Sequence, residues 1–104
     1  MLEDITYFVS RLDDANLKTR EELTLRILKL GEEYGEACNA WIGFTGQNPR
    51  KGIYGTKEDV VKELIDCAIT ALVAAESIHG SPIKNKFFME LARIRRRWME
   101  IQNG

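Results

Sequence analysis

The chain is most apolar over residues 66–75, which read DCAITALVAA. Only the aspartate and the threonine are polar in this segment, so a helix formed from it presents apolar surface on nearly every side. A helix of this kind is buried in a protein core or at an interface. Residues 66–75 therefore predict a central helix.

Outward from this segment, apolar residues recur in steps of three and four along the chain, and no alternating segment typical of a strand occurs. The sequence therefore predicts an all-α, four-helix bundle-like fold in a single domain, residues 1–104. The first helix should end near residues 13–16, and the fourth should start at Ser81-Pro82 and bury one face. The second should begin at Thr19 and the third at Thr56, because each threonine has an acid three residues later. The second should run to about Trp41, and the third should end at His79, before Gly80.

Composition excludes several classes of protein. The 15 Lys and Arg residues against 16 Asp and Glu residues leave a net charge of -1, which argues against coating of nucleic acid or anionic lipid. No apolar run approaches the ~20 residues of a membrane span, and the first residues are acidic, unlike a signal peptide. We therefore expect a cytoplasmic protein without membrane contact. Cys38 and Cys67 lie far apart, so neither a zinc site nor a disulfide framework is indicated.

The expected connection between the second and third helices, residues 42–55, is long for a small bundle. It contains four glycines and Pro49, together with Phe44, Tyr54, Arg50 and Lys51. Loops of this length are usually functional or disordered. Aromatic surface and positive charge on a glycine-rich segment favour covering of a ligand, with a plain connector as the alternative.

Two pairs of acids stand out beside the apolar segment. Glu33 and Glu36 are three residues apart, as are Glu63 and Asp66, so each pair projects from one face of its helix. If these helices pack antiparallel, four carboxylates converge, and they cannot all ionise without a cation. Oxygen ligands alone select a hard ion, Mg²⁺ or Mn²⁺. The alternative is that both pairs are solvated faces of amphipathic helices.

The segments around these acids read KLGEEYGEA at residues 29–37 and ELIDCAITAL at residues 63–72. Together they resemble the two motif helices of the MazG-like, all-α nucleoside triphosphate pyrophosphohydrolases. Between them, WIGFTGQNPRKG at residues 41–52 is similar to the loop of a small, single-domain branch of that family in bacteria and their phages. The chain departs from the family at the last helix, where four arginines between residues 93 and 97 replace the usual lysine and arginine.

The resemblance implies a MazG-type fold and Mg²⁺-dependent hydrolysis of a nucleoside triphosphate to the monophosphate and pyrophosphate, with Mn²⁺ as a substitute. It assigns Glu33, Glu36, Glu63 and Asp66 as the metal-binding and catalytic residues. A metal ion neutralises phosphate oxygens and lowers the pKa of bound water, and a carboxylate that is not fully engaged as a ligand can accept the water's proton.

Basic residues are the candidates for contact with the triphosphate. We expect this role for Lys29, Arg93, Arg97, Arg50 and Lys51. Lys29 lies one helical turn before the first acid pair, where it either reaches phosphate or offsets the repulsion between the acids. Arg93 and Arg97 are one turn apart on the last helix, so they share a face.

A second class of function stays open at this point. The chain could be a non-catalytic helical module that binds a protein or nucleic-acid partner through its basic last helix, with the acids as solvated charge. Under either function we expect a homodimer or tetramer assembled through the central helices, because residues 66–75 are apolar on more faces than one neighbouring helix can cover.

Overall fold

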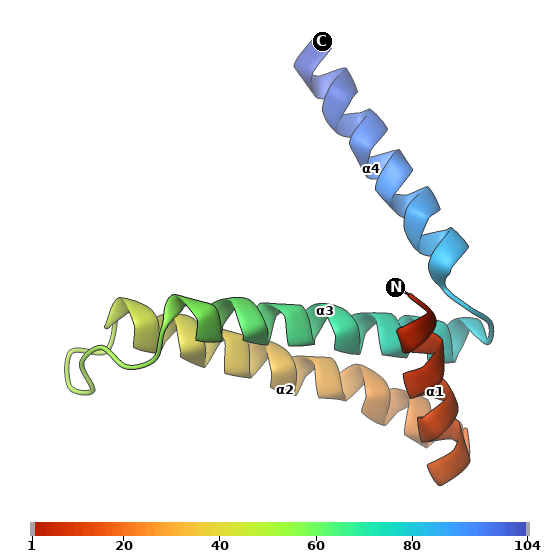
Figure 1. Ribbon diagram of the computed structural model, residues 1–104, viewed down its shortest axis with the longest axis horizontal. Helices are drawn as coiled ribbons and strands as arrows, with labels where there is room; N and C mark the ends of the chain where they lie inside the picture. The colour runs from red at the N-terminus through yellow and green to blue at the C-terminus, as the bar shows by residue number, and fades with distance from the viewer. Residues whose placement is uncertain (1, 104) are drawn as a thin grey trace.

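The computed structural model describes residues 2–103, and within that range it is helical with no strand, which confirms the all-α prediction. The four helices are α1 (Glu3–Ala15), α2 (Arg20–Thr45), α3 (Lys57–His79) and α4 (Lys84–Asn103). Figure 1 shows α2 and α3 as a long antiparallel hairpin, with α1 crossing one end and α4 projecting away from it. None of these helices combines the length and the hydropathy needed to cross a bilayer within the described residues.

Local capping signals set most of the helix ends. The Thr19 hydroxyl accepts a hydrogen bond from the Glu22 N–H at 3.2 Å. Thr56 and Asp59 form a reciprocal capping box, in which each side chain accepts from the other's backbone N–H. Gly80 ends α3 in the left-handed conformation, with φ of 83°. These contacts confirm the predicted starts of α2 and α3 and the predicted end of α3.

The end of α2 was predicted too early. The helix continues past Trp41 to Thr45 and stops at Gly46, which adopts φ of 66°. Gly43, inside this last turn, accepts a hydrogen bond from the Tyr54 N–H at 2.8 Å, and the Tyr54 ring lies so close that any Cβ at residue 43 would clash with it. The connection is therefore shorter than expected and folds back against the end of α2.

The buried core lies where α1 meets the end of α3 and the root of α4. Its buried members are Leu2, Ile5, Val9 and Ile83. Leu72 and Val73 of α3 and Phe87 of α4 pack against them. The core thus fixes the crossing of α1 over the hairpin and the point from which α4 leaves it (Figure 1).

The prediction of a buried face on the fourth helix is wrong for this chain by itself. The helix begins at Lys84, after Ser81-Pro82, and only its first turn reaches the core. Beyond that turn the apolar side chains are exposed, namely Leu91, Ile94, Trp98 and Ile101. The periodicity is that of a packing helix, but no other described element lies alongside it.

Candidate metal centre

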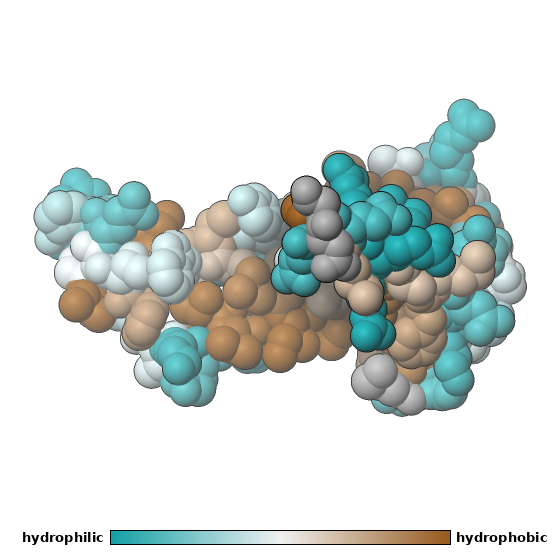
Figure 2. Space-filling view, turned by 90° about the horizontal axis from the view of Figure 1, so that it is seen from above, coloured by the Kyte–Doolittle hydropathy of each residue, from teal (hydrophilic) through white to brown (hydrophobic). Residues whose placement is uncertain are grey.

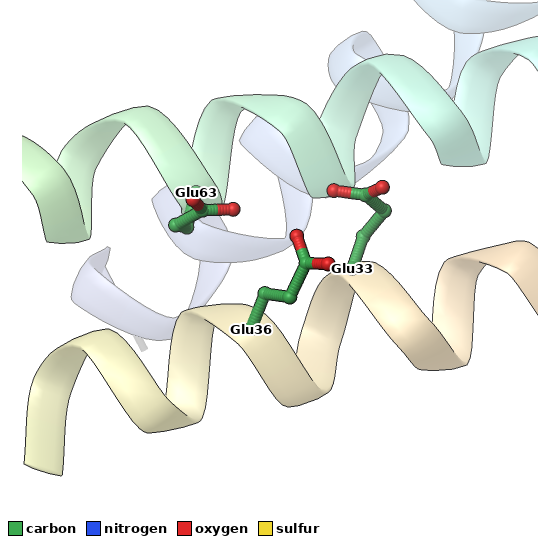
Figure 3. A group of neighbouring side chains, drawn as sticks. All are labelled: Glu33, Glu36 and Glu63. Atoms are coloured by element: carbon green, nitrogen blue, oxygen red, sulfur yellow. The ribbon is translucent and has the colours of Figure 1, made fainter.

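Three of the four predicted carboxylates meet between α2 and α3. Glu33 and Glu36 project from successive turns of α2, and Glu63 projects from α3 opposite them (Figure 3). One carboxylate oxygen from each residue lies within 4.8 Å of the others. The three-residue spacing puts the two α2 acids on one face, and the antiparallel hairpin brings the third acid to that face.

The three carboxylates differ in burial. The Glu33 side chain is 13% exposed and that of Glu63 is 22% exposed, whereas Glu36 is open to solvent. The Oε2 atom of Glu63 is buried and makes no hydrogen bond within the described residues. A buried acceptor without a partner costs free energy, so this oxygen is an uncompensated feature of the cluster.

The carboxylates of the cluster repel one another. The negative charge of Glu33 raises the pKa of Glu36, and desolvation and the nearby Glu63 act in the same direction. Lys29 partly offsets this repulsion, since its Nζ lies 3.5 Å from Oε1 of Glu33. The same Nζ is 3.7 Å from Oε2 of Glu32. The charges of Glu32 and Glu33 raise the pKa of Lys29, and a hydrogen bond to Glu33 raises it further.

Glu32 and Glu33 are adjacent acids on α2, and the structure places only one of them in the cluster. Glu33 points into the cluster, while Glu32 is exposed on the outer surface of α2. Glu32 is therefore a matched control for Glu33, with the same chemistry one residue away.

Asp66 lies one turn from Glu63 on α3, but its carboxylate stays outside the group of three. Its Oδ2 accepts a hydrogen bond from the Lys62 Nζ at 2.9 Å, and this contact raises the pKa of Lys62. Next to it, Cys67 is a free, half-buried thiol. Burial raises the pKa of Cys67, and the charges of Glu33 and Glu63 raise it further.

The basic residues predicted to contact phosphate lie apart from the acids, except for Lys29. Arg50 and Lys51 are exposed in the connection at the far end of the hairpin (Figure 1). Arg93 and Arg97 lie on the projecting α4, where the Arg93 Nε donates to Oε1 of Glu90 at 3.0 Å. Within one chain, the structure does not bring these four residues to the carboxylates.

Two features near the site did not follow from sequence patterns. An apolar pocket of about 420 Å³ lies between α2 and α3, with Tyr34, Cys38, Trp41 and Leu64 among its lining residues. Tyr34 and Trp41 are seven residues apart and so share one face of α2, but only the packed hairpin brings Leu64 of α3 opposite them to close a cavity.

The second feature is a buried arginine near the crossing of α1. The Arg26 side chain is 5% exposed and donates to Asp13 of α1, Glu22 of α2 and Ser77 of α3, each at 2.9 Å. Hydrogen bonds to Glu22 and Asp13 raise the pKa of Arg26, outweighing desolvation, which is the largest single influence and lowers it. The four-residue spacing of Glu22 and Arg26 was the one signal in the sequence that could have indicated this group.

Searches with the whole chain found no matching protein-family model, curated protein or solved structure.

Proposed function

We propose that the chain is a Mg²⁺-dependent nucleoside triphosphate pyrophosphohydrolase with a MazG-type fold, which releases a nucleoside monophosphate and pyrophosphate in the cytoplasm. The observation that carries the proposal is the convergence of Glu33, Glu36 and Glu63 from two helices. The resemblance of residues 29–37 and 63–72 to the motif helices of that family supplies the reaction.

The residues present fit a hard divalent cation. All three donors are carboxylate oxygens, which suit Mg²⁺ or Mn²⁺. Glu63 has a buried oxygen without a hydrogen-bond partner, and the charge of Glu33 raises the pKa of Glu36. A cation held by these three residues would satisfy that oxygen and relieve the repulsion.

Bound there, the metal would neutralise triphosphate oxygens and lower the pKa of the attacking water. The chain's own residues would orient the reacting groups. Asp66 is held by Lys62 in an exposed pair, which costs little to break. When its side chain turns away from Lys62, Asp66 becomes the fourth carboxylate, and a carboxylate of this set that is not a ligand accepts the proton from water.

Among the residues predicted to contact phosphate, Lys29 is the one that lies next to these acids. Its ammonium group already lies at the edge of the cluster, 3.5 Å from Glu33. A triphosphate bound at the carboxylates would compete for this ammonium group. The other predicted contacts lie too far from the carboxylates in one chain. Movement of the connection, or a second copy of the chain, would have to bring near Arg50 and Lys51 of the connection and Arg93 and Arg97 of α4.

A homo-oligomer of two or four copies belongs to this proposal. Apolar side chains are exposed along α3 as well as α4, including Val61, Ile65 and Ile69. Figure 2 shows apolar surface along the middle of the hairpin. Exposed apolar surface of this extent is typical of an interface.

Product analysis tests the proposed reaction. Purified protein is incubated with each of several nucleoside triphosphates, with and without Mg²⁺, and the products are separated by chromatography. We expect monophosphate and pyrophosphate, dependent on Mg²⁺, with modest discrimination between bases. Glu63→Gln should lower the rate by at least a hundredfold, whereas the control Glu32→Gln should stay near wild type. Diphosphate and inorganic phosphate as the products would overturn the reaction assigned here.

A second candidate function is supported by the exposed α4. A helix with an open apolar face and six basic residues can bind a protein or nucleic-acid partner without any catalysis. The two functions differ in the same assay. Absence of Mg²⁺-dependent turnover on every triphosphate, together with tight binding of a single-stranded oligonucleotide, would favour the interaction module.

A further inference from the structure

The charges of the chain are divided between α4 and the rest of the molecule. Residues 84–103 contain six Lys and Arg residues and two Glu residues, so their formal charge is +4. The remainder has nine basic and fourteen acidic residues, with a formal charge of -5. The near-zero total therefore combines a basic α4, residues 84–103, which we call the arm, with an acidic remainder, residues 1–83, which we call the body. Opposite charges of this size favour contact between an arm and a body.

Contacts at the start of α4 set the direction in which the arm points. The Ile83 side chain is 7% exposed in the core, and its N–H donates to the buried carboxylate of Glu76 at 2.9 Å. Glu76 also accepts from the Thr6 hydroxyl at 3.1 Å, and Phe87 packs against the same core. These contacts hold the start of α4 so that it points away from its own hairpin (Figure 1). The arm cannot fold back onto its own α3 without breaking them.

The chain exposes more surface than a folded monomer of its size. Its accessible surface is 8074 Å², whereas a compact 11.9 kDa monomer exposes about 5,900 Å². The excess of about 2,100 Å² exceeds the ~800 Å² that each partner buries in a standard stable interface. The radius of gyration, 17.2 Å, also exceeds the about 13 Å of a compact 100-residue domain. A second chain could cover the excess.

A receiving surface for the arm lies on α3. Val61 and Ile65 are half exposed and line a hollow of about 400 Å³. Glu58 and Asp66 border this hollow together with one basic residue, Lys62. An apolar floor with an acidic excess at its border matches an arm that alternates apolar side chains with arginines. Figure 2 shows the apolar surface along the hairpin from the side on which the arm projects.

We propose that two copies of this chain exchange their α4 arms, so that the apolar face of each arm packs on the Val61–Ile65 surface of the other copy's α3. The contact is reciprocal, as in a two-fold symmetric dimer, and it buries two arms at once. An isolated helix in water draws little stability from propensity alone, so docking also explains how α4 stays helical. The exchange specifies the interface of the homo-oligomer proposed above and does not depend on the enzymatic activity.

Paired substitutions on the arm and on the body test the exchange. Ile94→Glu puts a negative charge on the arm's apolar face, and Ile65→Lys puts a positive charge on the receiving surface. Asn85→Glu is the matched control, since residue 85 lies on the opposite face of α4 from residue 94 and is exposed. Each protein is measured by light scattering after size exclusion over a range of concentrations, and circular dichroism checks its helix content.

Wild type and Asn85→Glu should have about twice the mass of one chain at tens of micromolar. Each interface variant should raise the dimer dissociation constant at least tenfold. An equal mixture of Ile94→Glu and Ile65→Lys should recover dimer, because the intact arm of one variant can dock on the intact body of the other. Recovery on mixing also shows that both variants fold.

Other outcomes overturn the arm exchange. A dimer that Ile94→Glu leaves intact would assign the interface to α3 pairing with α3, and the homo-oligomer would stand without the exchange. A dimer that Ile94→Glu breaks and Ile65→Lys leaves intact would indicate that the arms pair with each other. Loss of dimer in both variants without recovery on mixing would also contradict the exchange. A wild-type monomer that binds an oligonucleotide through α4 would assign the basic arm to nucleic acid.

Discussion

Two groups of charged side chains lie about two turns apart along α2, and they differ in the source of the opposite charge. Near the crossing of α1, the buried Arg26 is neutralised by Asp13 and Glu22 of the same chain, each at 2.9 Å. In the middle of the hairpin, the three clustered carboxylates have two exposed lysines at their edge, Lys29 at 3.5 Å from Glu33 and Lys62 at 3.8 Å from Glu63. The charge of Arg26 is balanced within the protein, although its Nη2 atom is buried without a hydrogen-bond partner among the described residues. The carboxylate cluster instead has an excess of negative charge.

This difference separates a structural role from a binding role. Burying a charge is tolerated when its partners are packed around it, and removing one partner then destabilises the fold. A cluster of like charges lowers stability unless a ligand compensates it. The arginine group therefore ties α1, α2 and α3 together, and the carboxylate cluster is where an added cation would contribute most.

The largest expected effect comes from removing the arginine of the Arg26 group. Arg26→Met leaves Glu22 without its cation, leaves Asp13 only the more distant Lys18 at 3.9 Å, and removes the link to α3. We expect the free energy of unfolding to fall by about 3 kcal/mol, measured by urea denaturation at a fixed protein concentration. Arg20→Met, an exposed arginine on the same helix, is the control and should change stability by less than about 0.5 kcal/mol. Equal losses in both variants would contradict a structural role for Arg26.

The second-largest expected effect comes from adding a divalent cation to the carboxylate cluster. A cation that binds only the folded state stabilises it by RT ln(1 + [L]/Kd), about 2.7 kcal/mol at 100 times Kd. For a domain of this size, Mg²⁺ should then raise the melting temperature by on the order of 10 °C in wild type. Glu63→Gln should lose most of this rise, and Glu32→Gln should keep it. A scan in which Mg²⁺ and Mn²⁺ leave the wild-type melting temperature unchanged would remove the metal centre.

The smallest effect concerns pH in the metal-free protein. The pKa of Glu36 is raised above its ordinary value of 4.5, chiefly by the charge of Glu33. The folded state therefore holds this proton more tightly than the unfolded chain. As the pH rises from 4.5 through the raised pKa, this residue lowers the free energy of unfolding, and the loss persists at neutral pH.

Comparing wild type with Glu36→Gln isolates that contribution. Urea denaturation is repeated in small pH steps from 4 to about 7 with a chelator present. The variant should lack the part of the decline that Glu36 causes, so the two stability curves should converge at the acidic end and separate toward neutral pH. Curves that stay parallel over this range would show that the carboxylates do not repel each other in the metal-free fold.

Local features were predictable because the interactions behind them span only a few residues. Thr56 and Asp59 cap each other's backbone within one turn, and Gly80 adopts its left-handed conformation next to the helix that it ends. The acid pairs were visible for the same reason, since three-residue spacing puts two side chains on one helix face. The sequence by itself thus determined the four helices, most of their ends and the two pairs of acids.

Tertiary structure decided what depended on contacts between distant residues. Although the glycine at residue 46 ends α2 locally, the fold of the connection after it depends on Tyr54, which packs on Gly43, eleven residues earlier. Arg26 became buried because α1 and α3 brought Asp13 and Ser77 to it. No spacing rule within one helix reports such contacts.

The arrangement of the acids and of the last helix also depended on contacts between distant residues. Only the packed hairpin shows that Glu33, Glu36 and Glu63 meet while Asp66 turns to Lys62. Periodicity correctly indicated an apolar face on α4, but a periodic pattern states that a face needs a partner and does not say which chain supplies it. The buried root at Ile83 directs α4 away from its own hairpin, so the tertiary structure leaves that face to a partner outside the chain.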